Sequence, residues 1–190
     1  MPLCDKELVV SCLRGDAQAF AELVARYTEP IFNLAFRLTS DSAEAENVTQ
    51  ETFLRAYTAL PHSRTDLAFK PWLFQIAVNL CRDLARKKHP TAFANLAQDD
   101  DSADDPAPEE AIKDQSPLPL DRAEEHELKL ALAHAVADLP EIYRAVVTLR
   151  YNEEMSYEDM AAVLKLPVNT VRTHLFRAKT MLRKTLAEWA

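Results

Sequence analysis

The sequence predicts an all-α protein made of two small helical domains joined by a flexible acidic linker. Three observations lead to this fold class: the glycine content, the spacing of apolar residues and one acidic, proline-rich stretch. The 190-residue chain has a single glycine, although glycine averages about 7% of residues in globular proteins. Glycine supplies the positive φ angles of tight hairpins, phosphate-binding loops and nucleophile elbows, so barrels, sandwiches and nucleotide-binding folds are excluded. Apolar residues instead recur at steps of three and four, the period of an amphipathic helix.

The linker is expected at residues 89–121, where the composition changes abruptly. Residues 98–114 carry a net charge of -7 and no aromatic side chain, and five of the 11 prolines lie within the expected linker. Such a stretch cannot bury enough apolar surface to offset its ordering entropy. One long surface loop of a single domain is the alternative, but structureless loops beyond about 15 residues are uncommon within compact domains. The expected domains are residues 5–88 and 122–190.

The N-terminal domain opens with helical periodicity from about residue 5 to residue 39. Gly15 and Asp16 separate a first helix from a second. Pro30 is expected to mark the start of a third helix, because proline suits the first turn of a helix and disrupts its interior.

The next helix is expected to start after the natural N-caps Ser40 and Asp41 and to run to about Leu60. One line along it is expected to be buried: Ala45, Val48, Thr52, Phe53, Ala56 and Leu60. The opposite line is polar: Glu44, Asn47, Glu51 and Arg55, with Gln50 beside it. Most polar helix faces are simply solvated, and composition alone favours that interpretation here.

A polar loop at residues 62–71 precedes a helix expected from Pro71 to Lys88. Its core stripe is expected to be Leu73, Ile76, Ala77, Leu80 and Leu84. Trp72, Asn79 and Arg86 are spaced by seven residues, which returns to within about 20° of the same azimuth. An aromatic ring for stacking, an amide for a base edge and cations for phosphates suit contact with single-stranded DNA. A core tryptophan, with cations that stabilise a helix C-terminus, is the alternative.

The C-terminal domain is expected to begin with an amphipathic helix over 122–137, followed by a helix that starts at residues 139–140. The tract Ser156-Tyr157-Glu158-Asp159 is an S-x-x-D capping box for a short helix that ends near Leu164. Lys165-Leu166-Pro167 then precedes another helix start at residues 168–170. Two helices joined by so short a turn are typical of a helix-turn-helix.

The last helix combines an apolar stripe with a basic surface. The stripe is Val171, Leu175, Ala178, Leu182, Leu186 and Trp189. No acidic residue lies between Met160 and Ala187, and residues 160–190 carry a net charge of +5. Cations gathered on the second helix of a helix-turn-helix indicate insertion into a DNA major groove. A basic helix that binds nothing is the alternative.

Several classes of function are excluded by what the chain lacks. Cys4, Cys12 and Cys81 are odd in number and form no C-x-x-C pair, so we expect reduced thiols without a disulfide framework or a zinc site. The five histidines match no metal-ligand spacing and no nucleophile motif is present, so we expect no metal, no cofactor and no catalysis. Neither a signal peptide nor a transmembrane stretch is evident, so we expect a cytoplasmic protein without membrane insertion.

Five tracts together resemble the extracytoplasmic-function (ECF) group of sigma-70-family sigma factors. They are Ala45-Glu46-Asn47-Val48-Thr49-Gln50-Glu51-Thr52-Phe53-Leu54-Arg55-Ala56, Trp72-Leu73-Phe74-Gln75-Ile76-Ala77-Val78-Asn79, Leu139-Pro140, Ser156-Tyr157-Glu158-Asp159-Met160-Ala161 and Thr170-Val171-Arg172-Thr173-His174-Leu175-Phe176-Arg177-Ala178. The resemblance implies a dissociable subunit of bacterial RNA polymerase that recognises promoters. It also implies that residues 5–88 are sigma region 2, a helical bundle, and residues 122–190 are sigma region 4, a helix-turn-helix.

The resemblance implies binding residues in each domain. Those implied for the clamp coiled coil of the largest polymerase subunit are Glu44, Asn47, Gln50, Glu51 and Arg55. Those implied for opening the minus-10 DNA are Arg64, Phe69, Lys70, Trp72, Asn79, Arg82, Arg86 and Lys87. Those implied for the minus-35 DNA are Thr170, Arg172, Thr173, His174, Phe176, Arg177 and Lys179. The implied partners are core RNA polymerase, through its clamp and flap, promoter DNA, and an anti-sigma factor that wedges between the two domains.

The chain departs from the family pattern at three positions. Asn47 stands where aspartate is usual, which removes one charge from the clamp-facing surface. Asn169 stands where glycine is usual, and we expect asparagine to tolerate left-handed geometry there. His174 replaces a common arginine, so one phosphate contact or its independence of pH is in doubt. A helix-turn-helix regulator that binds a dimeric operator without polymerase is the alternative function, and the two N-terminal tracts argue against it.

Overall fold

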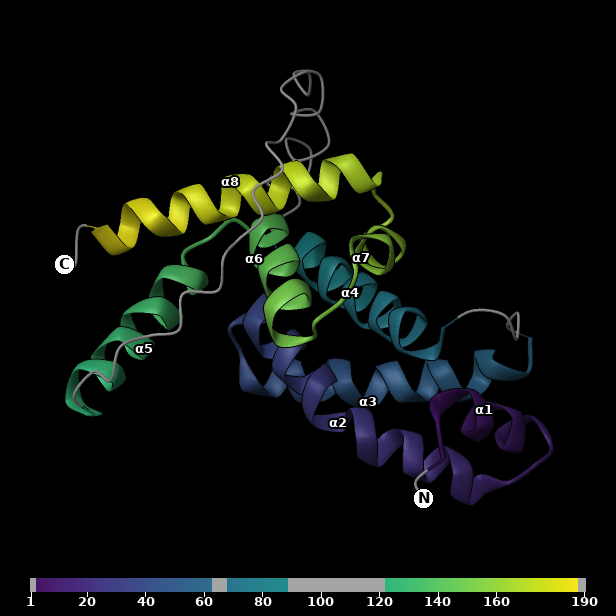
Figure 1. The fold of residues 1–190 in the computed structure, drawn as a ribbon. Helices are drawn as coiled ribbons and strands as arrows, with labels where there is room; N and C mark the ends of the chain where they lie inside the picture. The colour runs from purple at the N-terminus through teal and green to yellow at the C-terminus, as the bar shows by residue number, and fades with distance from the viewer. Residues whose placement is uncertain (1–2, 63–67, 89–121, 188–190) are drawn as a thin grey trace.

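The computed structural model describes residues 3–62, 68–88 and 122–187, and these ranges contain helices and no strand (Figure 1). The elements in chain order are α1 (Asp5–Leu13), α2 (Ala17–Thr39), α3 (Ser42–Ala59), the 3-10 helix η1 (Leu60–His62), α4 (Phe69–Lys88), α5 (Arg122–Ala137), α6 (Glu141–Val147), the π-helix η3 (Thr148–Asn152), α7 (Tyr157–Leu164) and α8 (Val168–Ala187). We call α1–α4 the N-terminal unit and α5–α8 the C-terminal unit. The expected linker, residues 89–121, lies outside the described residues. None of the described helices is long and apolar enough to span a membrane.

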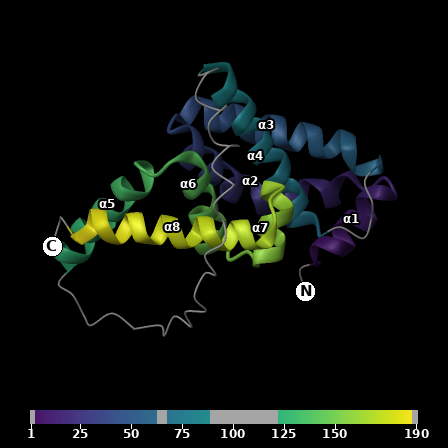
Figure 2. The same ribbon diagram turned by 90° about the horizontal axis from the view of Figure 1, so that it is seen from above.

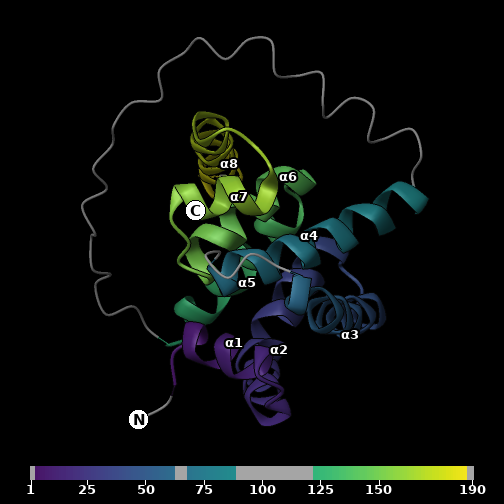
Figure 3. The same ribbon diagram turned by 90° about the vertical axis from the view of Figure 1, so that its right-hand side faces the viewer.

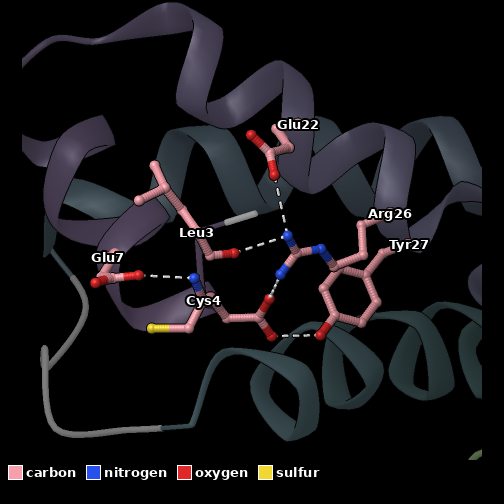
Figure 4. Close-up of polar contacts among 7 residues, drawn as sticks. Leu3, Cys4, Glu7, Glu22, Arg26 and Tyr27 are labelled. Carbon is pink, nitrogen blue, oxygen red and sulfur yellow. Dashed lines mark hydrogen bonds and ion pairs between the residues drawn. The ribbon is translucent and has the colours of Figure 1, made fainter. Parts of the chain in front are cut away.

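Helix α1 is bonded to α2 through the carboxylate of Asp5. The side chains of Arg26 and Tyr27, on α2, both donate hydrogen bonds to the Asp5 carboxylate in the first turn of α1 (Figure 4). Arg26 also donates to the Leu3 carbonyl at 2.9 Å and pairs with Glu22 at 3.0 Å. Burial, followed by the hydrogen bond to Asp5, raises the pKa of Tyr27, which keeps its hydroxyl a donor. The short helix α1 therefore depends on α2 for its position.

Helix α2 runs unbroken through Pro30, so the predicted helix start at this residue is wrong. Proline inside a helix removes one backbone hydrogen bond and costs about 3 kcal/mol. The buried stripe on α2 continues past Pro30 in the same phase: Leu23, Tyr27, Ile31 and Leu34. Fully burying one such side chain contributes about 1.5–3 kcal/mol. The stripe as a whole thus outweighs the cost of one proline.

Helix α3 agrees with its prediction. The side chain of Asp41 caps it by accepting from the backbone amide of Glu44 at 3.0 Å. Every residue of the predicted buried line is less than 9% exposed. Thr49 and Thr52 are buried too, and each hydroxyl donates to a carbonyl four residues earlier, at 2.7 Å. Their polar atoms are therefore satisfied within the helix.

The C-terminal unit contains the predicted helix-turn-helix. Ser156 caps α7 by accepting from the Asp159 amide at 3.0 Å, as the capping box predicted. Helix α7 ends at Leu164, its C-cap Lys165 has φ 57°, and three residues separate α7 from α8. Asn169, where we expected left-handed geometry to be tolerated, lies in the first turn of α8, and Lys165 is the residue of this turn with a left-handed conformation. Val171, Leu175 and Ala178 bury the predicted face of α8, whereas Trp189 lies outside the described residues.

The two units share one apolar core. Helix α4 lies between α2 and α3 on one side and α7 on the other (Figures 1 and 3). Buried residues from Leu8 in α1 to Ala178 in α8 belong to a single packed cluster. Helix α5 and the C-terminal half of α8 project away from the N-terminal unit, which is clear when the molecule is seen from above (Figure 2). Because α4 has neighbours on both sides, it is buried on more than the one face that its periodicity predicted.

Candidate nucleic-acid and polymerase interfaces

The N-terminal end of α4 is bonded to the C-terminal unit through Lys70. The ammonium group of Lys70 donates to the main-chain oxygen of Glu153 at 2.7 Å and lies 3.2 Å from the Glu153 carboxylate. The Glu153 side chain is only 8% exposed. The same ammonium lies 5.6 Å from the centre of the Phe74 ring. Lys70, a predicted minus-10 residue, is therefore occupied by contacts within the chain.

Two more side chains of α4 donate to the C-terminal end of α7. Gln75 donates to the Ala162 carbonyl at 2.6 Å, and Arg82 donates to the Leu164 carbonyl at 3.1 Å. Burial lowers the pKa of Arg82, and the nearby charge of Glu141 opposes this shift. Burial raises the pKa of Glu141, and the charges of Arg82 and Arg144 oppose that shift. Arg82 and Glu141 both line a cavity of about 310 Å³ between the units.

The other predicted minus-10 residues differ widely in exposure. Phe69 is 6% exposed and packs against the rings of Tyr27 and Trp72, both at 5.7 Å between ring centres. Its side chain is thus part of the core in this conformation. Trp72 and Asn79 are half-buried, whereas Arg86 and Lys87 are exposed. Arg64 lies outside the described residues. Arg86 also forms an ion pair with Asp83.

The outer surface of α8 is accessible, and two of its cations are held by aromatic rings. The guanidinium of Arg172 lies 5.4 Å from the centre of the Tyr157 ring. The ammonium of Lys179 lies 5.8 Å from the Tyr151 ring. Phe176 is 45% exposed between them, and the half-buried Thr170, Thr173 and Arg177 border the same surface. Cation–π contacts restrict long side chains, so these cations are oriented in advance of any ligand.

His174 does not belong to this outer surface. It lines the cavity between the units, and its ring meets that of Tyr143 edge-on at 5.5 Å. The helical period explains this placement, because His174 lies three residues after Val171 and four before Ala178, both fully buried. The same spacing in the sequence could have placed His174 on the inner face. The doubt about a phosphate contact at this position thus has a structural reason.

The predicted polymerase-binding line runs along the outer side of α3. Asn47, Gln50 and Arg55 are exposed, and Glu44 and Glu51 are half-buried. Arg55 pairs with Glu51 at 2.7 Å. Sequence reasoning missed Leu54, which is 61% exposed on the same side. Its position seven residues after Asn47 could have indicated this, since that spacing returns to one face.

A basic-rimmed apolar groove of about 540 Å³ lies between α5 and α8. Its apolar lining includes Leu132, Val136, Val147, Leu182 and Leu186. Its cationic lining is Arg37, Lys129, Lys179 and Arg183. An amphipathic helix with an apolar stripe and acidic flanks would complement such a surface.

Comparison with known proteins identifies both units. Residues 23–91 match the family model for sigma-70 region 2, and residues 129–182 match the model for sigma-70 region 4. The chain is 38% identical to the RNA polymerase sigma-H factor of Pseudomonas aeruginosa, over 96% of this chain and 93% of that protein. It is 32% identical to the ECF RNA polymerase sigma factor SigW of Bacillus subtilis, over 99% of this chain and 100% of that protein. The chain belongs to the ECF sigma factors of the sigma-70 family.

One solved structure resembles this ECF sigma factor over nearly its whole length. It is CnrH in complex with the cytosolic domain of CnrY, with a TM-score of 0.69 and 27% identity, covering 98% of this chain and 99% of that chain. The sigma factor is a transcription initiation factor and not an enzyme, as the sequence predicted. The surfaces on α3 and α4 lie within the region 2 match, and that on α8 lies within the region 4 match.

Proposed function

We propose that this ECF sigma factor directs core RNA polymerase to its promoters through three separate surfaces. Region 4, proposed as residues 122–190, recognises the minus-35 DNA through α8. Region 2, proposed as residues 5–88, opens the minus-10 DNA through α4 and binds the polymerase clamp through α3. Residues 89–121 connect the two. Such a factor acts in the cytoplasm, where the polymerase works.

One observation carries the proposal: the outer surface of α8, where Arg172 and Lys179 rest on tyrosine rings and Phe176 lies exposed between them. This helix is the second of a helix-turn-helix, and it carries no acidic side chain. Residues near the N-terminus of such a helix contact base edges in the major groove, and later cations contact phosphates. We therefore assign Arg172 to the base edges or nearby phosphates, and Lys179 to the phosphate backbone.

On α4, we propose that Trp72 and Asn79 receive the unstacked minus-10 base while Lys70, Arg82, Arg86 and Lys87 contact phosphates. Extruding a base costs a few kcal/mol, which stacking of about 1–3 kcal/mol per base can offset. Phe69 supports the Trp72 ring from within the core. Its contribution to DNA binding is then to position Trp72.

On α3, we propose that Leu54 adds an apolar centre to the polar line formed by Asn47, Gln50, Glu51 and Arg55. Interfaces commonly have an apolar core within a polar rim. The exposed ion pair between Arg55 and Glu51 would form part of that rim.

Transcription in vitro tests the function directly. The full-length protein with core polymerase should transcribe from fragments of a genomic library, whereas core polymerase alone should not. Arg172→Ala should lower promoter-dependent transcription while leaving the affinity for core polymerase unchanged. Leu54→Ala should lower the affinity for core polymerase, and Leu13→Ala, an exposed leucine on α1, is the matched control. A palindromic footprint without polymerase would instead support the dimeric regulator.

We also propose that an anti-sigma factor holds this protein inactive by placing an amphipathic helix in the groove between α5 and α8. The cationic rim favours a helix with acidic flanks. The structurally similar CnrH was solved with a polypeptide partner, the cytosolic domain of CnrY. Co-expression with the adjacent reading frame should give a complex in size-exclusion chromatography. In that complex Leu182→Glu should weaken the association, because a buried charge in the groove is costly.

A further inference from the structure

We propose that two tyrosines outside the predicted DNA surface, Tyr157 and Tyr151, are positioning residues for minus-35 recognition. Tyr157 holds the guanidinium of Arg172, and Tyr151 holds the ammonium group of Lys179. Neither tyrosine lies on α8, because Tyr157 begins α7 and Tyr151 belongs to the π-helix η3. This inference rests on the proposed function, which assigns Arg172 and Lys179 to DNA. It makes the orientation of both cations depend on elements that precede α8 in the chain.

The two cations are held in a way that leaves their charge available to DNA. Within the described ranges, neither Arg172 nor Lys179 forms an ion pair. On α3, by contrast, Arg55 pairs with Glu51. An ion pair must break before its cation binds a phosphate, whereas an aromatic face attracts a cation without neutralising it. The two rings therefore restrict these side chains and leave their positive charge for the ligand.

The Tyr157 ring is itself held in place. The guanidinium of Arg150, from η3, lies 5.1 Å from the centre of this ring, and that of Arg172 lies 5.4 Å from it. Arg150 also donates to the Met155 carbonyl at 2.8 Å. Tyr157 follows Ser156, whose side chain caps α7, and it packs against the buried core cluster. A ring with these restraints has few orientations, so the guanidinium of Arg172 that lies against it has few as well.

The π-helix η3 brings Tyr151 to the side chain of Lys179. The Glu153 amide bonds to the Thr148 carbonyl five residues earlier, at 3.2 Å, which is the hydrogen bond of a π-helix. Such a turn holds one residue more than the α-helical turn it replaces, so it changes which side chains face α8. Tyr151 is 53% exposed and lines the groove between α5 and α8 together with Lys179. The irregular turn thus has a use, which is to supply one of the two rings.

The positions of the two cations on α8 predict different roles for their tyrosines. Residues near the N-terminus of such a helix contact base edges, and later cations contact phosphates. A planar guanidinium can keep one face on a ring while its N–H edge meets a base, and this bidentate contact depends strongly on orientation. Loss of the Tyr157 ring should therefore weaken discrimination between bases at the Arg172 contact. Loss of the Tyr151 ring should weaken the phosphate contact of Lys179, which all sequences share.

The expected effect is modest and specific to the ring. Restricting a flexible side chain before binding lowers the entropy lost in the complex. A cation–π contact at an exposed site corresponds to a change of about two- to fivefold in an equilibrium constant. We expect Tyr157→Leu to raise the Kd of the assembled polymerase for promoter DNA by about this factor. Tyr157→Phe keeps the ring and should keep the wild-type Kd, which would exclude a direct contact between the tyrosine hydroxyl and DNA.

Double-mutant cycles test whether each tyrosine acts through its own cation. The full-length protein is assembled with core polymerase, and the probe is a promoter fragment recovered from the library transcription. Tyr157→Leu should cost nothing more once Arg172→Ala has removed the guanidinium, because the ring then has nothing to position. The same should hold for Tyr151→Leu combined with Lys179→Ala. The crossed pair, Tyr157→Leu with Lys179→Ala, is the matched control and should be additive.

Sequence preference and salt dependence separate positioning from a merely structural role. The Kd is measured for fragments in which each base pair of the minus-35 element is changed in turn. Tyr157→Leu should reduce the penalty for one of these changes, whereas Tyr151→Leu should keep every penalty and lower the salt slope by up to about one. A tyrosine needed only for folding would reduce the amount of active protein and would move neither readout.

The orientation of Arg172 is also measurable without polymerase. In the full-length protein with isotope-labelled arginine, the ring current of Tyr157 should shift the NMR signal of the Arg172 Nε–H group, which is identified by its loss in Arg172→Ala. Tyr157→Leu should abolish this shift and increase the mobility of the group, and Tyr157→Phe should preserve both. Circular dichroism confirms that each variant is folded.

The outcomes separate the positioning role from the proposed function. An Arg172 signal that is the same in Tyr157→Leu as in wild type overturns the proposal, and so does a Tyr157→Leu penalty that persists in Arg172→Ala. Equal losses for all fragments in both tyrosine variants, with an unchanged salt slope, also overturn it. If the wild-type protein with core polymerase fails to bind any promoter fragment, the proposed function fails, and the NMR signal still decides whether the ring holds the guanidinium.

Discussion

Arg144 gives the most direct test of how the two units are joined, because one side chain bridges three segments. Its guanidinium donates to the Arg37 carbonyl at 2.9 Å and the Ser40 hydroxyl at 3.2 Å in the N-terminal unit. It also donates to the Leu139 carbonyl at 3.0 Å, just before α6. Burial lowers the pKa of Arg144, and Glu141 and Asp138 oppose the shift. The Arg144 side chain is thus partly desolvated, and its guanidinium forms hydrogen bonds with both units.

Arg144→Ala should destabilise the fold by about 2 kcal/mol. Hydrogen bonds to charged groups contribute about 1.5–3 kcal/mol, and we take the lower part of this range because the site is only half-buried. For a chain of this size, a loss of 2 kcal/mol lowers Tm by about 4–8 °C. Urea unfolding followed by circular dichroism measures the free energy, and a thermal scan measures Tm.

Arg55→Ala is the matched control for this measurement. Arg55 forms one exposed i,i+4 ion pair with Glu51, and such pairs contribute about 0.3–0.5 kcal/mol. The two arginine variants should therefore differ clearly. If Arg144→Ala costs no more than Arg55→Ala, its bridging contacts do not stabilise the closed arrangement, and our account of the interface between the units is wrong.

Three further predictions concern single groups. Burial, with the charges of Glu141 and Glu44, raises the pKa of the Cys81 thiol to about 12, so iodoacetamide at pH 8 should alkylate exposed Cys4 and spare Cys81 until the protein unfolds; equal rates would contradict this. Burial raises the pKa of Glu141 in the folded state, so its charge destabilises the fold once the pH rises above the unfolded value of about 4.3. Glu141→Gln should accordingly increase the free energy of unfolding at pH 7, and the advantage should disappear near pH 4; a gain that persists at pH 4 would have another cause. Ser156→Ala removes the cap of α7 and should cost about 1 kcal/mol in urea unfolding, whereas a neutral result would show that α7 does not need its cap.

Helix boundaries followed from local chemistry wherever a cap or periodicity was decisive. Asp41 and Ser156 begin their helices as predicted, because a side-chain acceptor within three residues satisfies free amides whatever the tertiary structure. The buried line of α3 was predictable for the same reason, since one helical stripe faces one core. Pro30 was mispredicted because the burial of the α2 stripe against other helices outweighs the local cost of the proline, and a single sequence does not display those neighbouring helices.

The surfaces were harder to predict than the helices. Periodicity assigned α4 one buried stripe, but Phe74, Val78 and Cys81 are also buried, because α4 contacts helices on opposite sides. His174 was assigned to the DNA surface through its place in a motif, although its spacing from Val171 put it on the inner face. Which polar side chains of α4 are occupied depends on the other unit, more than seventy residues further along the chain.

Three turns of this protein have non-glycine residues with positive φ angles, and all three lie at the interface between the two units. With one glycine in the chain, Ser40, Glu154 and Lys165 adopt φ angles of 57°, 53° and 57°. Non-glycine residues in this region cost of order 1–3 kcal/mol each. Ser40 accepts from Arg144 across the interface, Glu154 follows the buried Glu153, and Lys165 follows the carbonyl that Arg82 binds. Each strained turn therefore contains or adjoins a group that joins the two units, so a glycine introduced at Glu154 or Lys165 would relieve backbone strain at this interface without altering any surface proposed for DNA or polymerase.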